Sequence, residues 1–218
     1  MDIDFWKKRW EDGQTGWHAS EYNKHLVAFF PRLGLSAGQR VLVPLCGKTD
    51  DMLFLVEQGL NVVGVEVSPM ACRAFFNEAG LTFIERQEGE VLVFEGESVT
   101  LYCTDLFHLK PEDIPRIDGC YDRACLIAME KPQRVRYVRW LSDMLCSGAA
   151  SLMLAVEYPS GEKNGPPFSV PKLEVNTLYG GGFECTELHR EDILETSPKY
   201  REWGVTELIE TAYLIRRT

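Results

Sequence analysis

Apolar runs that alternate with amphipathic segments dominate the first half of the chain. Val41–Leu45 and Asn61–Val67 are almost continuously apolar, which is typical of buried parallel strands. Residues 50–58 between them predict a helix, and Ser68 followed by Pro69 supplies an N-cap and a first-turn proline for another helix. Strands joined by helices in this way predict a largely parallel sheet.

An amphipathic region precedes this alternation. Trp6 and Trp10 are four residues apart, so a helix places both indoles on one face. Ser20 is a suitable cap for a second helix over residues 21–30, which Pro31 would end. The region therefore predicts two helices ahead of the first strand.

The second half of the chain predicts more strands with fewer helices between them. Apolar or alternating segments predict strands at residues 82–84, 91–94, 99–103, 117–121, 149–157, 183–188 and 208–216. Helices are predicted at residues 132–145 and 171–178, whereas residues 189–206 have no clear period and predict a loop or a short helix. Two late strands without a helix between them indicate an antiparallel pair.

These elements predict an α/β fold in a single domain of residues 1–218. We expect a doubly wound, mostly parallel seven-stranded sheet with helices on both faces and an antiparallel strand pair at the C-terminal end. Residues 1–35 would form an N-terminal helical lid, and residues 36–218 the α/β core. At 218 residues the chain can bury a core without disulfides or metal.

Charge and cysteine content narrow the class of partner. The formal net charge is −10, which disfavours binding to nucleic acid and to anionic membrane surfaces. The seven cysteines include no CxxC pair, so we expect neither a disulfide framework nor a metal site. No signal-like or membrane-length apolar run occurs, and we expect a cytoplasmic protein whose partner is a small molecule.

Ligands of open α/β sheets bind beyond the carboxyl ends of the strands, and the turn after Val41–Leu45 is the first such place. Its Gly-Lys-Thr run is not a phosphate-binding loop, because that motif needs a glycine where Leu42 stands. A dinucleotide-binding turn needs three glycines, whereas only Gly47 is present. One tight glycine turn suits a nucleoside-type ligand that lacks a pyrophosphate.

Acidic residues follow two further strands. Glu66 lies 19 residues after Gly47 and is either a ribose-binding carboxylate or a surface acid at a strand end. We favour ribose binding, because an acid between an apolar strand and a capped helix is poorly placed for solvent. Asp105, with the apolar Leu106 beside it, can accept from the amino group of an adenine or can cap a helix, and the sequence does not decide between these roles.

The remaining candidates are basic or aromatic. Arg123 lies at a strand end in an apolar stretch and needs a partner, which is Asp122, a ligand carboxylate or an anionic substrate atom. The tryptophans near the N-terminus either pack on the body of the protein or cover a cationic ligand, which indole faces attract. Trp17 and His18 follow a glycine turn, and His18 is either structural or a proton acceptor.

Several runs in fixed order carry a family resemblance. In this order the chain contains WKKRWEDGQTGWH, VLVPLCGKTDDM, VVGVEVS, LYCTDLF, YDRACLIA and GPPFSVP. Over nearly the whole chain these runs resemble the thiopurine S-methyltransferases. PLCGK followed by VGVE, with GPPF far downstream, is specific to that family, whereas class I methyltransferases in general carry a glycine-richer first loop.

The resemblance implies a single methyltransferase domain that uses S-adenosylmethionine to methylate the sulfur of aromatic or heterocyclic thiols such as thiopurines. Carried over by position, the cofactor would be bound by Trp6, Trp10, Leu45, Glu66, Asp105, Leu106 and Arg123. The substrate would be contacted by Arg123 and by Trp17, where relatives often carry phenylalanine. The segment around Arg201 and Trp203 matches less closely and would cover the acceptor.

The implied chemistry requires no general base, because a sulfonium is already a methyl donor and an aromatic thiol needs little help to lose its proton. Arg123 and His18 are the candidates for such help. The resemblance also implies a monomer. Alternatives are methylation of selenium or tellurium compounds, with a role in tellurite resistance, a nucleotide-dependent oxidoreductase, and a non-catalytic cofactor-binding domain.

Overall fold

The computed structural model describes residues 3–123 and 125–218. The chain forms two compact units, each defined by the contacts among its own residues. The N-terminal unit ends at Tyr121, and the C-terminal unit begins at Asp122.

The N-terminal unit consists of parallel strands with a short antiparallel extension. Its helices are α1 (Ile3–Glu11), α2 (Lys24–Leu33), α3 (Asp51–Glu57) and α4 (Pro69–Glu78), with short 3₁₀ helices at Leu106–His108 and Pro111–Asp113. Its strands are β1 (Arg40–Pro44), β2 (Asn61–Glu66), β3 (Ile84–Glu88), β4 (Val91–Glu95), β5 (Val99–Cys103) and β6 (Ile117–Asp122).

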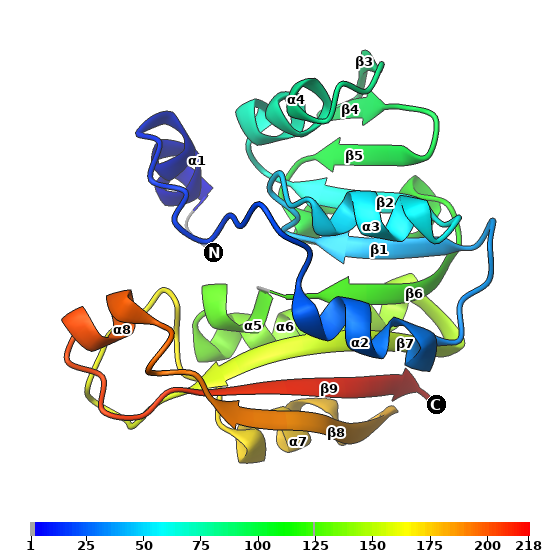
Figure 1. Cartoon of the computed structure of the whole chain (residues 1–218). Helices are drawn as coiled ribbons and strands as arrows, with labels where there is room; N and C mark the ends of the chain where they lie inside the picture. The colour runs from blue at the N-terminus through cyan, green and yellow to red at the C-terminus, as the bar shows by residue number, and fades with distance from the viewer. Residues whose placement is uncertain (1–2, 124) are drawn as a thin grey trace. The chain divides into compact units, whose positions relative to one another are not determined.

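The strand order in this unit is β3-β4-β5-β2-β1-β6. β1 pairs in parallel with β2 and β6, and β2 pairs in parallel with β5, whereas β3–β4 and β4–β5 are antiparallel. Figure 1 shows α3 and α4 running alongside these strands. Because β1, β2 and β5 run the same way, the turns that follow them lie at one edge of the sheet.

Local sequence signals explain most helix ends here, with one correction. Ser68 caps α4 as predicted, its side chain accepting a hydrogen bond from the Ala71 amide at 3.3 Å. The predicted helix over residues 21–30 begins later, because Asn23 and not Ser20 is the cap. Pro31 lies inside this helix instead of ending it. Proline there removes one hydrogen bond close to the helix end, where the helix has only two residues left to form.

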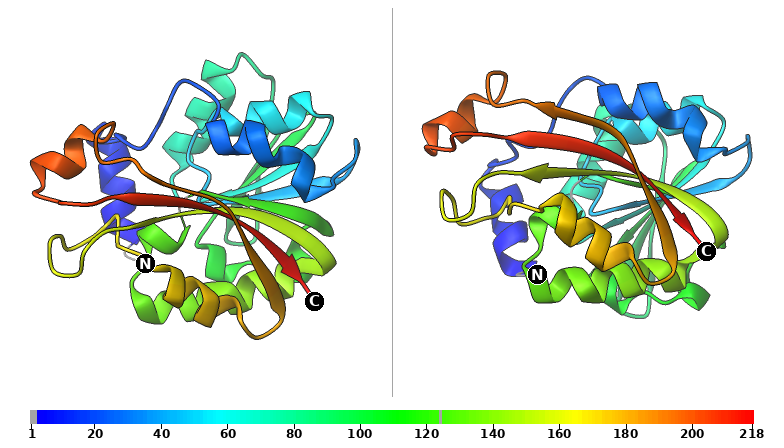
Figure 2. Two further views of the ribbon diagram at one scale, coloured as in Figure 1. Left: turned by 60° about the horizontal axis from the view of Figure 1, so that its bottom comes forward. Right: turned by 90° about the horizontal axis from the view of Figure 1, so that it is seen from below.

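The C-terminal unit is built on long antiparallel strands. Its helices are α5 (Cys125–Ala128), α6 (Lys131–Met144), α7 (Lys172–Tyr179) and α8 (Pro198–Glu202), and its strands are β7 (Leu145–Glu157), β8 (Phe183–Asp192) and β9 (Ile209–Arg217). β9 lies between β7 and β8 and is antiparallel to both, which confirms the predicted late antiparallel pair. Figure 2 shows the three strands twisting together, with α7 beside β8.

Two parts of the predicted fold are wrong. The described residues form nine strands, six in the N-terminal unit and three in the C-terminal unit; each overlaps one of the nine segments predicted singly, but the expected seven-stranded sheet is wrong. The arrangement is also mixed and not mostly parallel, since both pairings among β7, β8 and β9 are antiparallel. The segment predicted as a loop or short helix at residues 189–206 contains the end of β8 and the short helix α8.

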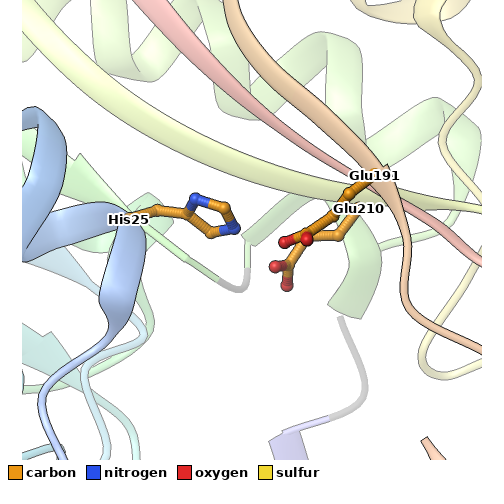
Figure 3. A group of neighbouring side chains, drawn as sticks. All are labelled: His25, Glu191 and Glu210. Carbon is orange, nitrogen blue, oxygen red and sulfur yellow. The ribbon is translucent and has the colours of Figure 1, made fainter. Parts of the chain in front are cut away.

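Adjacent antiparallel strands bring two acids together in the C-terminal unit. Glu191 of β8 is directly opposite Glu210 of β9, and Figure 3 shows their carboxylates side by side. The third side chain drawn there, His25, belongs to α2 of the N-terminal unit.

All seven cysteines are free thiols. No described helix has the combination of length and apolar character needed to cross a bilayer.

A buried arginine joins three segments of the C-terminal unit. Arg134 of α6 is 1% exposed, and its Nε donates to the carbonyl oxygens of Leu126 and Met129, each at 2.9 Å. Its guanidinium also pairs with Glu174 of α7 at 2.7 Å and donates to the Ser169 carbonyl at 3.3 Å. One side chain therefore ties α5, α7 and the segment before α7 to α6.

Replacing this arginine should destabilise the protein. Arg134→Ala leaves three carbonyls and a carboxylate without their donor, and we expect the free energy of unfolding to fall by about 3–5 kcal/mol. Arg139→Ala, which removes an exposed arginine of the same helix, should change it by less than about 0.5 kcal/mol. Urea unfolding measures both, and equal effects would contradict the structural role of Arg134.

Candidate functional site

The turn after β1 has an unusual backbone. Leu45 has a φ of 48° and Gly47 a φ of 54°, both in the left-handed region that glycine tolerates and leucine rarely adopts. The Cys46 amide between them donates to the Val65 carbonyl of β2 at 3.1 Å. The turn is therefore fixed to the neighbouring strand by this hydrogen bond.

The Glu66 carboxylate joins this turn to the end of β2. Its Oε2 accepts a hydrogen bond from the Gly47 amide at 2.9 Å, and its Oε1 accepts from the Val67 and Ser68 amides, both at 2.8 Å. The residue is 6% exposed. The predicted alternative of a solvated surface acid is therefore wrong.

Burial and hydrogen bonding have opposite effects on the acidity of Glu66. Desolvation raises the pKa of its carboxyl, because burial disfavours the charged form, and the three amide donors lower it without cancelling the rise. The result is a carboxylate held in one orientation whose pKa is above its ordinary value.

The end of β5 is connected to the same place. The Thr104 amide donates to the Glu66 carbonyl at 2.9 Å. Asp105 caps the next 3₁₀ helix, its Oδ1 accepting from the Phe107 amide at 3.0 Å, and Leu106 is fully buried. The capping role predicted as one alternative for Asp105 is thus observed. Oδ2 of Asp105 makes no hydrogen bond to any residue that the structure describes, so it can still accept from a ligand.

Indoles from the N-terminal segment cover the turn. Trp10 is 7% exposed, and its Cζ2 lies 3.1 Å from the position that a Cβ at Gly47 would take. Trp17 contacts Trp10 edge-to-face with a ring separation of 5.8 Å and Trp6 with one of 5.5 Å. The Arg9 guanidinium lies over the Trp17 ring at 5.2 Å. The structure therefore brings Trp6, Trp10 and Trp17 into one aromatic cluster around Trp17, and Trp6 and Trp10 both belong to α1, the helix predicted to carry them.

Two predicted residues, His18 and Arg123, lie in different units of the chain. His18 is half-buried, and its amide closes a turn onto the Thr15 carbonyl at 2.9 Å. Arg123 is half-buried in the C-terminal unit, directly after β6. The carboxylate of its neighbour Asp122 accepts from the Cys125 amide at 3.0 Å and from the Tyr137 hydroxyl at 2.7 Å.

The downstream segment predicted to cover the acceptor contacts a loop of its own unit. Lys163 lies 4.3 Å from the ring of Trp203, which is 44% exposed. The Glu162 carboxylate accepts from the Thr206 amide at 2.9 Å and from its hydroxyl at 2.6 Å. A hollow of about 460 Å³ lies beside this loop, with side chains of both charges around it, Lys131 and Glu157 among them.

Sequence reasoning missed one buried acid of the N-terminal unit. Asp51, the first residue of α3, is 1% exposed and accepts from the Asn23 amide and from the Tyr121 hydroxyl. An acid in the first turn of a helix is usual near the surface. The partners of Asp51 are 28 and 70 residues away, so no local signal indicates its burial.

Comparison with known proteins gives one consistent family. The family model described as Thiopurine S-methyltransferase matches residues 1–218. A protein of Pseudomonas entomophila named thiopurine S-methyltransferase is 42% identical over 217 residues, covering 100% of both chains.

Solved structures show the same fold at low identity. A Burkholderia thailandensis N1-methyltransferase, solved with 1,6-didemethyltoxoflavin and S-adenosylhomocysteine, has a TM-score of 0.67 at 17% identity, covering 99% of this chain and 87% of its own. The cyclase SpnF has a TM-score of 0.63 at 17% identity, covering 88% and 78%. Because proteins named for different reactions share the fold, fold alone does not assign the reaction.

The close approach at Gly47 leads to a testable prediction. Gly47→Ala adds a Cβ at a left-handed position and against Trp10, and we expect it to lower the free energy of unfolding by about 2–3 kcal/mol. Gly34→Ala is the matched control, because Gly34 has a φ of 67° with nothing within 4 Å of the added Cβ. It should cost only the backbone strain of about 1–2 kcal/mol. Equal losses on urea unfolding would show that Trp10 does not restrict this position.

Proposed function

The chain belongs to the thiopurine S-methyltransferase family, and we propose that it transfers a methyl group to the sulfur of an aromatic or heterocyclic thiol. It is an enzyme whose methyl donor is S-adenosylmethionine. The whole of residues 1–218 is proposed to act as one methyltransferase domain. The observation that supports the proposal most is the buried Glu66 carboxylate, fixed by amides of the turns after β1 and β2.

The geometry of Glu66 fits the ribose of the donor. A carboxylate has about four lone-pair sites, two on each oxygen. Oε1 uses both of its sites on the Val67 and Ser68 amides, whereas Oε2 uses one on the Gly47 amide. We therefore assign to Oε2 the acceptance of a hydrogen bond from a ribose hydroxyl. The single glycine at the turn, with no glycine-rich loop, suits a nucleoside without a pyrophosphate.

Neighbouring residues fit the remaining parts of a sulfonium nucleoside. Leu45 would line the cofactor at the turn, Leu106 would lie on the apolar side of the adenine, and Oδ2 of Asp105 would accept from its amino group. Trp10 is proposed to cover the positive sulfur, since indole faces attract cations by about 0.5–2 kcal/mol. Trp6 is proposed to lie near the cofactor beside Trp10. Trp17, whose ring contacts both indoles, is proposed to contact the acceptor.

The contribution of the protein to catalysis is mainly positioning. When bound, S-adenosylmethionine would supply a methyl group on a positively charged sulfur. The acceptor sulfur would bond to the methyl carbon as the bond from that carbon to the sulfonium breaks, and S-adenosylhomocysteine would be the leaving group. Orientation of two reactants contributes up to about 7–11 kcal/mol to lowering a barrier. The indole cluster would exclude water from the reacting atoms. No general base is required for an aromatic thiol; Arg123 is proposed to favour the anionic form of the acceptor sulfur, with His18 as the alternative proton acceptor.

Ligand binding and turnover test the proposal directly. S-Adenosylmethionine and S-adenosylhomocysteine should raise the melting temperature, because both bind the folded state, whereas NADPH and ATP should not. An aromatic thiol should be methylated in the presence of the donor. Stabilisation by NADPH alone would indicate an oxidoreductase, and donor binding without methylation of any thiol or selenol would indicate a binding protein.

Substitution of Glu66 tests the site. Glu66→Ala should weaken S-adenosylhomocysteine binding by about 1.5–3 kcal/mol, the loss expected for a hydrogen bond to a charged group. Glu66→Gln replaces one acceptor oxygen with an NH2 group that would face a backbone N–H donor, so it should weaken binding as well. Glu97→Ala, at an exposed acid, should bind as the wild type does. Calorimetry measures all three, and an unchanged Kd in Glu66→Ala would remove this residue from the site.

The raised pKa of Glu66 predicts a pH dependence of the same binding. The charged carboxylate is the better acceptor, so affinity should be full above its pKa and should fall as the pH drops through it. Because burial raises this pKa, the fall should begin at a higher pH than for an ordinary glutamate. Glu66→Gln, uncharged at every pH, should show no such step.

A further inference from the structure

We propose that Asp51 is a positioning residue of the methyl-transfer site, whose carboxylate fastens residues 3–23 beside the turn that follows β1. We call residues 3–23 the N-terminal strap. The inference deepens the proposed function and rests on it.

Asp51 makes short, buried hydrogen bonds to two distant parts of the N-terminal unit. Its Oδ1 accepts from the Asn23 amide at 2.7 Å, and its Oδ2 accepts from the Tyr121 hydroxyl at 2.9 Å. The side chain is 1% exposed. A buried carboxylate without donors would be costly, so these bonds fix Asn23 and Tyr121 relative to α3.

Asn23 is the last residue of the strap and the N-cap of α2. Its side chain caps α2 by accepting from the His25 amide at 2.9 Å and the Leu26 amide at 3.3 Å. Its own amide is the donor to Asp51. The end of the strap is therefore held on both sides, by α2 and by the first residue of α3.

Two buried attachments of the strap lie close together along the chain. Trp10 packs on Gly47, and Asn23 is bonded to Asp51 only four residues further on. The strap therefore contacts the turn after β1 at Trp10, and its last residue, Asn23, is bonded close to the same turn. Fixing one end of a loop restricts the space that the other end can sample. Loss of the Asp51 bond would leave Trp10 in place for a smaller fraction of the time.

A second contact at the same end of the strap provides a control. The Tyr22 hydroxyl donates to Glu57 at 2.7 Å, and its ring packs on Phe54 at 5.5 Å. This hydrogen bond is exposed and raises the pKa of Tyr22 to about 12. Tyr22→Phe removes the exposed bond and keeps the ring, so it should leave the strap in place.

The main test is S-adenosylhomocysteine binding by Asp51 variants at a temperature where each is folded. If Trp10 of Asp51→Ala packs on Gly47 for about a tenth of the time, the Kd of this variant for S-adenosylhomocysteine should rise roughly tenfold. Asp51→Asn can still accept from Asn23 and donate to Tyr121, and should recover most of the affinity. Tyr22→Phe should resemble the wild type. Amide hydrogen exchange within residues 3–23 should accelerate in Asp51→Ala without ligand, whereas β1 and β2 should not change.

A backbone variant tests the same bond without changing Asp51. Asn23 has a φ of −61°, which proline also adopts. Asn23→Ala loses the cap and keeps the amide donor, whereas Asn23→Pro loses both. A weaker affinity in Asn23→Pro than in Asn23→Ala therefore reports the bond to Asp51. This comparison applies even if Asp51→Ala does not fold.

The outcomes separate the two proposals. Wild-type affinity in both Asp51→Ala and Asn23→Pro, with only a lower melting temperature, would show a purely structural acid and would overturn the inference. Failure of the wild type to bind S-adenosylhomocysteine would overturn the proposed function, and the inference with it. Weaker binding in Asp51→Ala that Asp51→Asn restores supports both.

Discussion

Three backbone amides converge on the Glu66 carboxylate, and the local arrangement at the end of the N-terminal sheet depends on this contact. The bonds from Gly47, Val67 and Ser68 join the turn after β1 to the turn after β2. Parallel strands alone would bring these turns near each other, but would not fix their backbones. The carboxylate does so at the cost of burying a charge, which the amides partly offset. The Glu66 carboxylate that fixes the two turns is also the group proposed to bind the ribose of S-adenosylmethionine.

The sequence predicts the parts of the fold in which burial and local capping agree. The apolar runs of β1 and β2 and the Ser68–Pro69 helix start were predicted because each is determined by near neighbours. Edge strands were predicted less well. β3 carries charged residues along most of its length, and β8 ends in the polar segment 189–192. Most side chains of these two strands are exposed, so neither strand needs a continuous apolar face. Charge on an edge strand also discourages pairing with another strand.

Residues of the candidate site were likewise predicted where local spacing determines their position and missed where distant contacts do. The positions of Glu66 and of the tryptophan pair were predicted, because each depends on spacing along one element: the end of a strand and one face of a helix. Asp51 was not found, because its burial depends on Asn23 and Tyr121, which no periodicity connects to it. The dual possibility left open for Asp105 also needed the structure, since a cap and a ligand contact require the same residue at the same strand end.

The aromatic cluster has a practical consequence. Of the five tryptophans in the chain, Trp6, Trp10 and Trp17 are in mutual contact through Trp17, whereas Trp140 and Trp203 belong to the C-terminal unit. Three of the five indoles therefore lie at one location, and their emission should respond to the same local environment. A change at the turn after β1 should therefore alter the emission spectrum, and the enzyme carries its own optical reporter without any added dye.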